Sequence, residues 1–286
     1  MSIKVENLTH TYNSGTAFEK KAIDDLSFEI KDGDFVGLIG HTGSGKSTLI
    51  QHFNALLAPT SGKIYFNGED INADKTKLKH FRTKIGLVFQ YPEYQLFETT
   101  VFADVAFGPK NMGLSEEEIE SRVKEALTIV GIDESVYESS PFELSGGQKR
   151  RAAIAGVLAM KPEVIILDEP TAGLDPKGRD EILNEIAKMH KILGITVILV
   201  SHSMEDVAKY VNRIIVMHNG KIKYSGTPEE IFGKAEELVE IGLDVPQITH
   251  VFKELKAQGI DVPDNIFTVD EAEKVLYDLL KQVEKC

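Results

Sequence analysis

The sequence has one cysteine, no long apolar run and too few basic residues to balance its acidic ones. The cysteine, Cys286, is the last residue, so no disulfide forms within the chain, which fits a reducing compartment. The longest apolar stretches, 164–167 and 196–200, are too short to cross a bilayer. The first residues lack the apolar core of a signal peptide. We therefore expect a soluble, cytoplasmic protein with no membrane span of its own.

The charge balance argues against two classes of partner. Lysine and arginine total 32 against 45 acidic residues, which gives a net charge of −13. A nucleic-acid-binding surface needs a basic face, so we expect no nucleic-acid partner. A polybasic segment for anionic lipids is also missing. Any polyanionic ligand must therefore be held by a local site rather than by the field of the whole protein.

Alternating strands and helices predict an α/β fold with a mainly parallel sheet. Asn219-Gly220 lies between two further apolar runs, 214–217 and 221–224, and predicts a β-hairpin. A half-exposed strand is predicted over 26–30. The other predicted strands are 35–39, 83–89, 164–167 and 196–200, and the predicted helices are 46–57, 115–130 and 178–193.

Beyond Pro228 the pattern is that of helices alone. Thr268 and Glu271 form a predicted capping box for the last helix. We expect a main domain over 1–226 and a small helical appendage over 227–286. The inner faces of its two long helices are predicted to consist of Ile248, Val251, Phe252 and Leu255, and of Ala272, Val275, Leu276, Leu279, Leu280 and Val283.

Residues 40–47 match the phosphate-binding P-loop pattern between a buried strand and a helix. Glycines let successive backbone N–H groups curl around a phosphate, and the positive end of the helix faces the same charge. Lys46 would place its ammonium against the β- and γ-phosphates, and the Ser47 hydroxyl would bind Mg²⁺. The alternative is a glycine-rich turn without a ligand. The predicted ATP-binding residues here are Gly40, His41, Thr42, Gly43, Ser44, Gly45, Lys46, Ser47 and Thr48.

An apolar strand ends in two adjacent acids, Asp168 and Glu169. Because side chains alternate along a strand, the two carboxylates face different directions and perform different tasks. We assign Asp168 to Mg²⁺ and Glu169 to the base that polarises the attacking water. Solvated acids at a strand end are the alternative interpretation.

A second anion-binding loop opens the helix that follows Leu144. It consists of Ser145, Gly146, Gly147 and Gln148. One ATP does not need two such loops from one subunit, so we expect this loop to serve a nucleotide held by another protomer.

With these motifs in this order, residues 1–225 resemble an ABC ATPase. The resemblance implies a P-loop domain with an antiparallel β subdomain and an inserted helical subdomain at about 91–160. It implies that Tyr12 stacks on adenine, that Gln90 senses Mg²⁺ and the attacking water, that Asp175 crosses a dimer interface and that His202 contacts the γ-phosphate. Glu169, His202, Gln90 and Lys46 would then form the catalytic set.

Three stretches, 16–22, 89–98 and 144–151, resemble the energy-coupling factor (ECF) branch, and in particular the second ATPase of its heterodimeric modules. This resemblance implies a second ATPase subunit, an integral transmembrane coupling subunit and a substrate-binding membrane subunit. The chain would then lie at the cytoplasmic face of the membrane. The C-terminal helices would help to hold the two ATPases together. The cargo, a vitamin or a metal ion in such systems, is left open.

Aromatic residues are dense between 90 and 107, and two interpretations are open. Phe102 and Phe107 are expected in the core of the helical lobe. Another group is expected to line a groove for a helix of the transmembrane subunit, where acids would suit a basic anchor. That group is Tyr91, Glu93, Tyr94 and Glu98.

Three other functions remain open. A conventional ABC importer or exporter would carry the same cassette. A non-transport ABC ATPase usually shows a coiled coil or two cassettes, and neither is present. A small-molecule kinase would use the P-loop but would not need residues 144–148.

Overall fold

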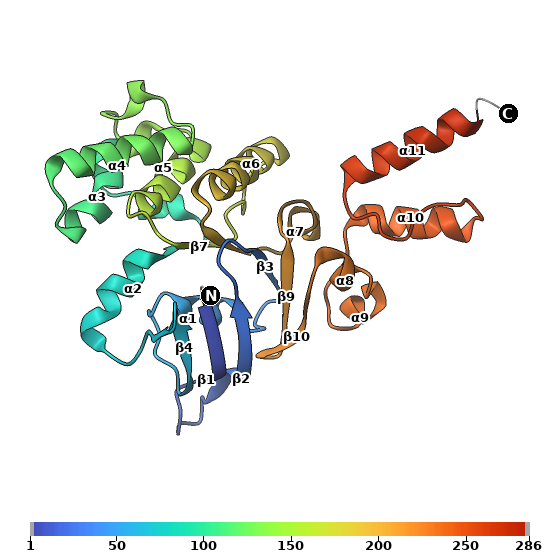
Figure 1. The fold of residues 1–286 in the computed structure, drawn as a ribbon, viewed down its shortest axis with the longest axis horizontal. Helices are drawn as coiled ribbons and strands as arrows, with labels where there is room; N and C mark the ends of the chain where they lie inside the picture. Colours follow the sequence, from blue (N-terminus) through green and yellow to red (C-terminus); the bar gives the residue numbers. More distant parts are fainter. Residues whose placement is uncertain (1–2, 284–286) are drawn as a thin grey trace.

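The computed structural model describes residues 3–283, and it shows a six-stranded sheet with the strand order β10-β9-β3-β8-β7-β6. All neighbours run parallel except β9 and β10, which form the predicted hairpin. The predicted α/β fold is therefore confirmed (Figure 1). The strands are β3 (Phe35–Ile39), β6 (Ile85–Val88), β7 (Val164–Asp168), β8 (Thr196–Val200), β9 (Arg213–His218) and β10 (Lys221–Gly226).

A second sheet is antiparallel, with the order β2-β1-β4-β5. Its strands are β1 (Ile3–Tyr12), β2 (Lys20–Ile30), β4 (Ser61–Phe66) and β5 (Glu69–Asp70). The strand predicted at 26–30 is only the second half of β2, because β2 pairs with β1 as far as Tyr12 opposite Lys20. Pairing with a neighbour extends a strand beyond its own alternating pattern.

Alternate residues of the central strands face two hydrophobic clusters. Val36 and Ile166 belong to the cluster shared with the antiparallel sheet, α1 (Lys46–Phe53) and α2 (Leu78–Lys84). Phe35 and Ile165 belong to the larger cluster on the opposite face. That cluster includes the inserted lobe and the helices that follow it, namely α3 (Val101–Met112), α4 (Glu116–Ile129), α5 (Gly146–Leu158), α6 (Pro176–Leu193) and α7 (Met204–Tyr210).

Two local predictions need correction. The helix predicted to reach residue 57 ends at Phe53, because Ala55 turns left-handed and the Asn54 amide donates to the Ile85 carbonyl. Phe107 is 45% exposed on the surface of the helical lobe, where its ring meets that of Phe97, so it is not a core residue. Phe102 does pack against the core.

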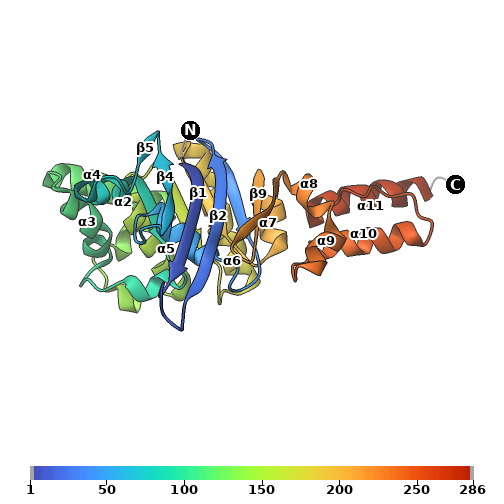
Figure 2. The same ribbon diagram turned by 90° about the horizontal axis from the view of Figure 1, so that it is seen from below.

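Up to residue 283, helices alone follow β10: α8 (Pro228–Phe232), α9 (Ala235–Glu240), α10 (Gln247–Ala257) and α11 (Val269–Val283). Phe232 and Leu238 are buried in the larger cluster of the main body. The α10–α11 pair instead has its own small cluster, formed by Phe252, Val262, Ile266 and Ala272. The pair projects from one end of the molecule (Figure 2). We refer to residues 247–283 as the α10–α11 arm.

The capping box that begins α11 is confirmed, since Thr268 N–H donates to Glu271 Oε2 (3.0 Å) and Glu271 N–H to Thr268 Oγ1 (3.3 Å). The predicted inner faces of α10 and α11 include residues that the structure leaves exposed. Val251 is 45% and Leu280 is 64% exposed, because two packed helices cover only a narrow stripe of each other. The predictions for the Val283 side chain and for Cys286 lie outside what the structure describes. No helix within residues 3–283 has both the length and the apolar character of a membrane span.

Candidate nucleotide-binding site

The predicted phosphate-binding loop connects β3 to α1 in a conformation that requires glycine. Gly40, Gly43 and Gly45 all have positive φ. A Cβ on Gly40 would lie 2.4 Å from the Met217 carbonyl oxygen, and one on Gly45 would lie 2.5 Å from that of Ala22. The loop therefore holds its backbone close to two neighbouring strands, as a phosphate cradle requires.

Lys46 is the cation of this loop and is 5% exposed. Its Nζ donates to the carbonyls of Gly40 (2.6 Å) and His41 (3.3 Å). Burial lowers the pKa of Lys46, and the carboxylates of Glu169 and Asp168 oppose that shift. A buried ammonium facing these acids is placed to receive a polyanion.

Glu169 lies at the centre of the polar site. Its Oε2 accepts a hydrogen bond from Gln90 Nε2 (2.8 Å), and His202 Nε2 lies 2.8 Å from its Oε1. The backbone of Glu169 is left-handed, with φ of 49°, and its N–H donates to the Val200 carbonyl (3.0 Å). Three residues predicted from separate parts of the sequence thus meet in one place.

The pKa of Asp168 is raised to about 6, first by burial and then by the neighbouring charge of Glu169, while Lys46 opposes the shift. Such a carboxyl gains strongly from a bound cation, because a positive ion removes both the desolvation penalty and the like-charge repulsion. The carboxylate of Asp168 is a hard oxygen donor of the kind that an ion such as Mg²⁺ prefers.

A cleft of about 470 Å³ brings together residues of the loop, Gln90, Glu169 and His202, but Asp168 is not among its lining residues. Tyr12 borders it, with its hydroxyl 3.2 Å from Thr48 Oγ1. The sequence analysis did not predict Lys20 and Ala22 as lining residues. They reach the cleft because β2 pairs with β1, which places Lys20 opposite Tyr12. The lining residues are Tyr12, Lys20, Ala22, Thr42, Gly43, Gly45, Lys46, Ser47, Thr48, Gln90, Glu169 and His202.

Three further predicted residues belong to the loop but do not line the cleft. Gly40 approaches the Met217 backbone, and His41 packs its ring against that of His218 at 5.0 Å. Ser44 is fully buried, and its Oγ has no hydrogen-bond partner among the described residues.

The second anion loop lies outside this cleft. Ser145 caps α5 in a reciprocal box with Gln148, in which Ser145 N–H donates to Gln148 Oε1 (3.0 Å) and Gln148 N–H to Ser145 Oγ (3.3 Å). A Cβ added to Gly146 or Gly147 would meet nothing within 4 Å. Asp175 is also exposed, and it caps α6 by accepting from Gly178 N–H (2.7 Å). The structure therefore leaves both groups open at the surface.

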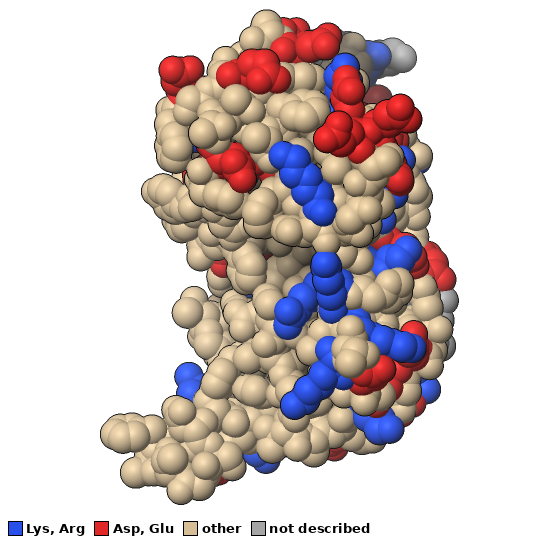
Figure 3. Space-filling view, turned by 90° about the vertical axis from the view of Figure 1, so that its left-hand side faces the viewer, with Lys and Arg blue, Asp and Glu red and all other residues tan. Residues whose placement is uncertain are grey.

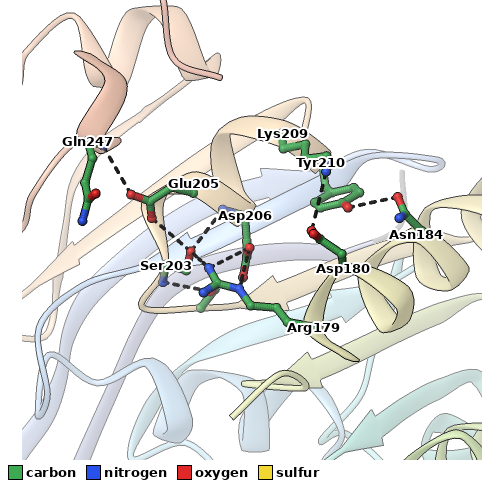
Figure 4. Close-up of polar contacts among 10 residues, drawn as sticks. Arg179, Asp180, Asn184, Ser203, Glu205, Asp206, Lys209, Tyr210 and Gln247 are labelled. Carbon is green, nitrogen blue, oxygen red and sulfur yellow. Dashed lines mark hydrogen bonds and ion pairs between the residues drawn. The ribbon is translucent and has the colours of Figure 1, made fainter. Parts of the chain in front are cut away.

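Figure 4 shows how the segment after His202 is fixed. Arg179 Nε donates to both carboxylate oxygens of Asp206 at 2.9 Å, and its Nη2 donates to Ser203 Oγ. Glu205 accepts from Gln247 N–H (3.3 Å) at the start of the α10–α11 arm. The loop that carries His202 is thereby tied to α6 and to the arm. No sequence motif marked Arg179, because its partners lie on another helix.

One predicted groove residue is already occupied. Glu93 forms a bidentate ion pair with Arg150 at 2.8 and 3.1 Å, and Arg150, 2% exposed, also donates to the Pro170 carbonyl (2.9 Å). Glu93 is therefore paired within the chain, and its place in a groove for the transmembrane subunit stays a prediction. Tyr91 and Tyr94, at 40% and 84% exposure, do face outward.

A sequence profile described as "ABC transporter" matches residues 23–172, which is more than half of the chain. The chain belongs to the ABC transporter family. It is 61% identical to the energy-coupling factor transporter ATP-binding protein EcfA2 of Clostridium tetani over 96% of both chains. It is 58% identical to the EcfA2 of Caldanaerobacter subterraneus over 98% of both chains.

Solved structures of this ABC family agree with the fold. The first is cbiO1 from Clostridium perfringens, described as part of the ABC transporter complex cbiONQ, with a TM-score of 0.76 and 43% identity; the match covers 88% of this chain and 98% of that one. The second is the ATP-binding cassette MJ0796, a dimer bound to ADP and Pi, with a TM-score of 0.70 and 32% identity; the match covers 79% and 98%.

Proposed function

We propose that this chain is the ATP-binding and ATP-hydrolysing subunit of an ECF-type importer. The meeting of Gln90 and His202 on Glu169, beside Lys46, carries this proposal. These polar contacts hold a base, a water-orienting amide and an imidazole together next to a phosphate cradle. That combination is the one needed to direct water onto a terminal phosphate.

The residues present fit ATP with Mg²⁺. Tyr12 would contact the base at one end of the cleft, and Lys46 the β- and γ-phosphates at the other. The Ser47 hydroxyl, Gln90 and Asp168 would hold Mg²⁺, which when bound neutralises charge on the phosphates. The raised pKa of Asp168 and the crowded glycines of the loop support this fit.

Glu169 acts as the base in this proposal. Its carboxylate accepts from Gln90 Nε2 and lies 2.8 Å from His202 Nε2, which fixes the direction in which it can accept a proton from water. His202 then lies where it can donate to an oxygen of the transferred phosphoryl group. Lys46 stabilises the charge that spreads over the departing phosphate.

The exposed loop of Ser145 to Gln148 serves the ATP of a second ATPase subunit. Its open glycines at the start of α5 suit an anion that arrives from outside this chain. Two subunits packed head to tail would each complete the other's site, with Asp175 at the interface. ATP favours the closed pair only to the extent that it binds the closed state more tightly than the open one, and loss of the γ-phosphate removes that difference.

A transmembrane subunit would dock on the helical lobe, and a substrate-binding membrane subunit would complete the importer at the cytoplasmic face of the membrane. The exposed aromatic residues Tyr91, Tyr94, Phe97 and Phe107 offer the apolar contact. Figure 3 shows acidic side chains over the upper part of the lobe end of the molecule and basic side chains across its middle. A charged docking helix would therefore meet a surface that has both acidic and basic regions.

The test combines the chain with its partner ATPase and the membrane subunits in vesicles. We expect ATP and Mg²⁺ to strengthen the association of the two ATPase subunits. We also expect them to drive uptake of the substrate that the substrate-binding membrane subunit captures. The variant Lys46→Ala should lose both effects. If the pair fails to tighten with nucleotide while the wild-type protein still binds ATP, the shared-site mechanism is wrong. Co-purification with membrane subunits that lack a substrate-capturing subunit would instead favour a conventional ABC transporter.

A further inference from the structure

Two buried histidines, His10 of β1 and His52 of α1, contact each other beside the predicted base-contacting residue Tyr12. The rings of His10 and His52 lie 4.7 Å apart at 69°, and those of His10 and Tyr12 lie 4.5 Å apart at 79°. Both contacts are edge-to-face, the arrangement that aromatic rings favour. The three rings form a continuous row from the P-loop helix to the edge of the cleft.

The row is anchored at both ends. His52 Nδ1 lies 3.1 Å from the Leu57 carbonyl, and the Tyr12 hydroxyl lies 3.2 Å from Thr48 Oγ1. Thr48 and His52 are one turn apart on α1, so the same face of that helix holds both ends of the row. Lys46, on the same helix, also lines the cleft.

Simple filling of the core does not account for these residues. His10 is 8% and His52 is 0% exposed, yet both nitrogens of His10 and Nε2 of His52 have no hydrogen-bond partner among the described residues. Burying unpartnered ring nitrogens costs stability that a phenylalanine would not cost. What the pair contributes is a fixed ring plane behind Tyr12.

We propose that His10 and His52 are positioning residues that hold the Tyr12 ring in place for the nucleotide base. This inference rests on the proposed ATP site. A ring fixed beforehand loses less rotational freedom when the base binds, so affinity for the nucleotide is higher. Because the row ends on α1, base contact and phosphate contact are made by one rigid unit.

The experiment compares two ligands on the full-length chain with Mg²⁺: ADP, which carries a base, and inorganic tripolyphosphate, which does not. His10→Ala should weaken ADP binding about two- to tenfold and leave tripolyphosphate binding unchanged. His10→Phe keeps a ring behind Tyr12 and should restore the affinity for ADP. The exposed His80 provides the matched control, and His80→Ala should change neither affinity.

Three outcomes decide the matter. Equal weakening of both ligands by His10→Ala would mean that the histidines only support the fold, and the inference would be overturned. Unchanged ADP binding would overturn it too. Lys46→Ala must weaken both ligands. If the wild-type chain binds neither ligand, the proposed nucleotide site itself is wrong, which is a different failure.

Discussion

The main body and the α10–α11 arm bury different shares of their apolar residues. In the body, alternate strand residues enter two large clusters, and the polar site groups are held by partners from other elements. In the arm, a small cluster holds two helices together, while large apolar side chains remain exposed. The difference indicates that the body folds around large cores of its own, whereas the arm leaves a greater share of its apolar side chains exposed. The exposed apolar residues of the arm are Val251, Ile260, Val269, Tyr277 and Leu280.

The strongest way to separate the two regions is to disable chemistry in the body alone. Glu169→Gln should keep ATP binding and reduce turnover more than about hundredfold, because the amide cannot accept a proton from water. Steady-state ATPase rates and nucleotide titrations on the assembled complex measure this. Normal hydrolysis by this variant would show that Glu169 is not the base.

Arg150 tests how strongly the body depends on its internal polar contacts. Arg150→Met should lower the free energy of unfolding by about 3–5 kcal/mol, because it leaves the partly buried Glu93 carboxylate without its partner. Chemical denaturation gives the value. Lys149→Met is the matched control and should stay within about 0.5 kcal/mol of the wild type. A similar loss in both variants would remove the special role of the ion pair.

The two regions should also differ in their response to acid. Burial lowers the pKa of His52 from an ordinary 6.5 to about 4, so the unfolded chain binds a proton at higher pH than the folded one. Stability should therefore fall by roughly 3 kcal/mol as the pH drops from 6.5 to 4, and His52→Met should remove this share. The arm's His250, which is exposed and lies 2.8 Å from Asp244, provides the control. His250→Met should leave most of the slope in place.

The smallest effect on the fold is expected in the arm. Tyr277→Ser combined with Leu280→Ser should change the free energy of unfolding by less than about 0.5 kcal/mol, because both side chains are already exposed. The same double variant should weaken association with the partner ATPase about tenfold, measured by sedimentation. Phe252→Ala, in the buried cluster, should instead destabilise the arm. Unchanged association would contradict our proposal that the arm helps to hold the two ATPases together.

Much of the site could be predicted from the sequence because its signals are local. The glycine spacing before Lys46 and the two acids after an apolar strand each specify their own geometry. The capping box at Thr268 was predictable for the same reason, since both partners lie within one turn. The resemblance supplied Gln90 and His202, and the structure brings both to Glu169.

The remaining features depend on contacts between distant segments. Glu93 seemed available to a partner because nothing nearby in the sequence pairs with it, yet Arg150 does so across the helical lobe. Arg179 gave no signal for the same reason. The boundary between the main body and the last helices also differs when it is judged by packing instead of by secondary structure. The change to helices follows Gly226, as predicted, but residues up to Val245 still pack in the main-body cluster, and Phe267 of the arm returns to it, with its ring 5.7 Å from that of Phe232. We therefore propose truncation after Val245 for experiments that remove the arm.

The Arg150 guanidinium also has a mechanical consequence. It lies on α5, the helix that Ser145 caps. It donates to Glu93, in the turn that follows Gln90, and to the carbonyl of Pro170, directly after Glu169. If the helical lobe rotates against the sheet, the guanidinium moves with it and displaces the segments that follow Gln90 and Glu169. The orientation of the helical lobe and the alignment of Gln90 with Glu169 are thus coupled within one subunit.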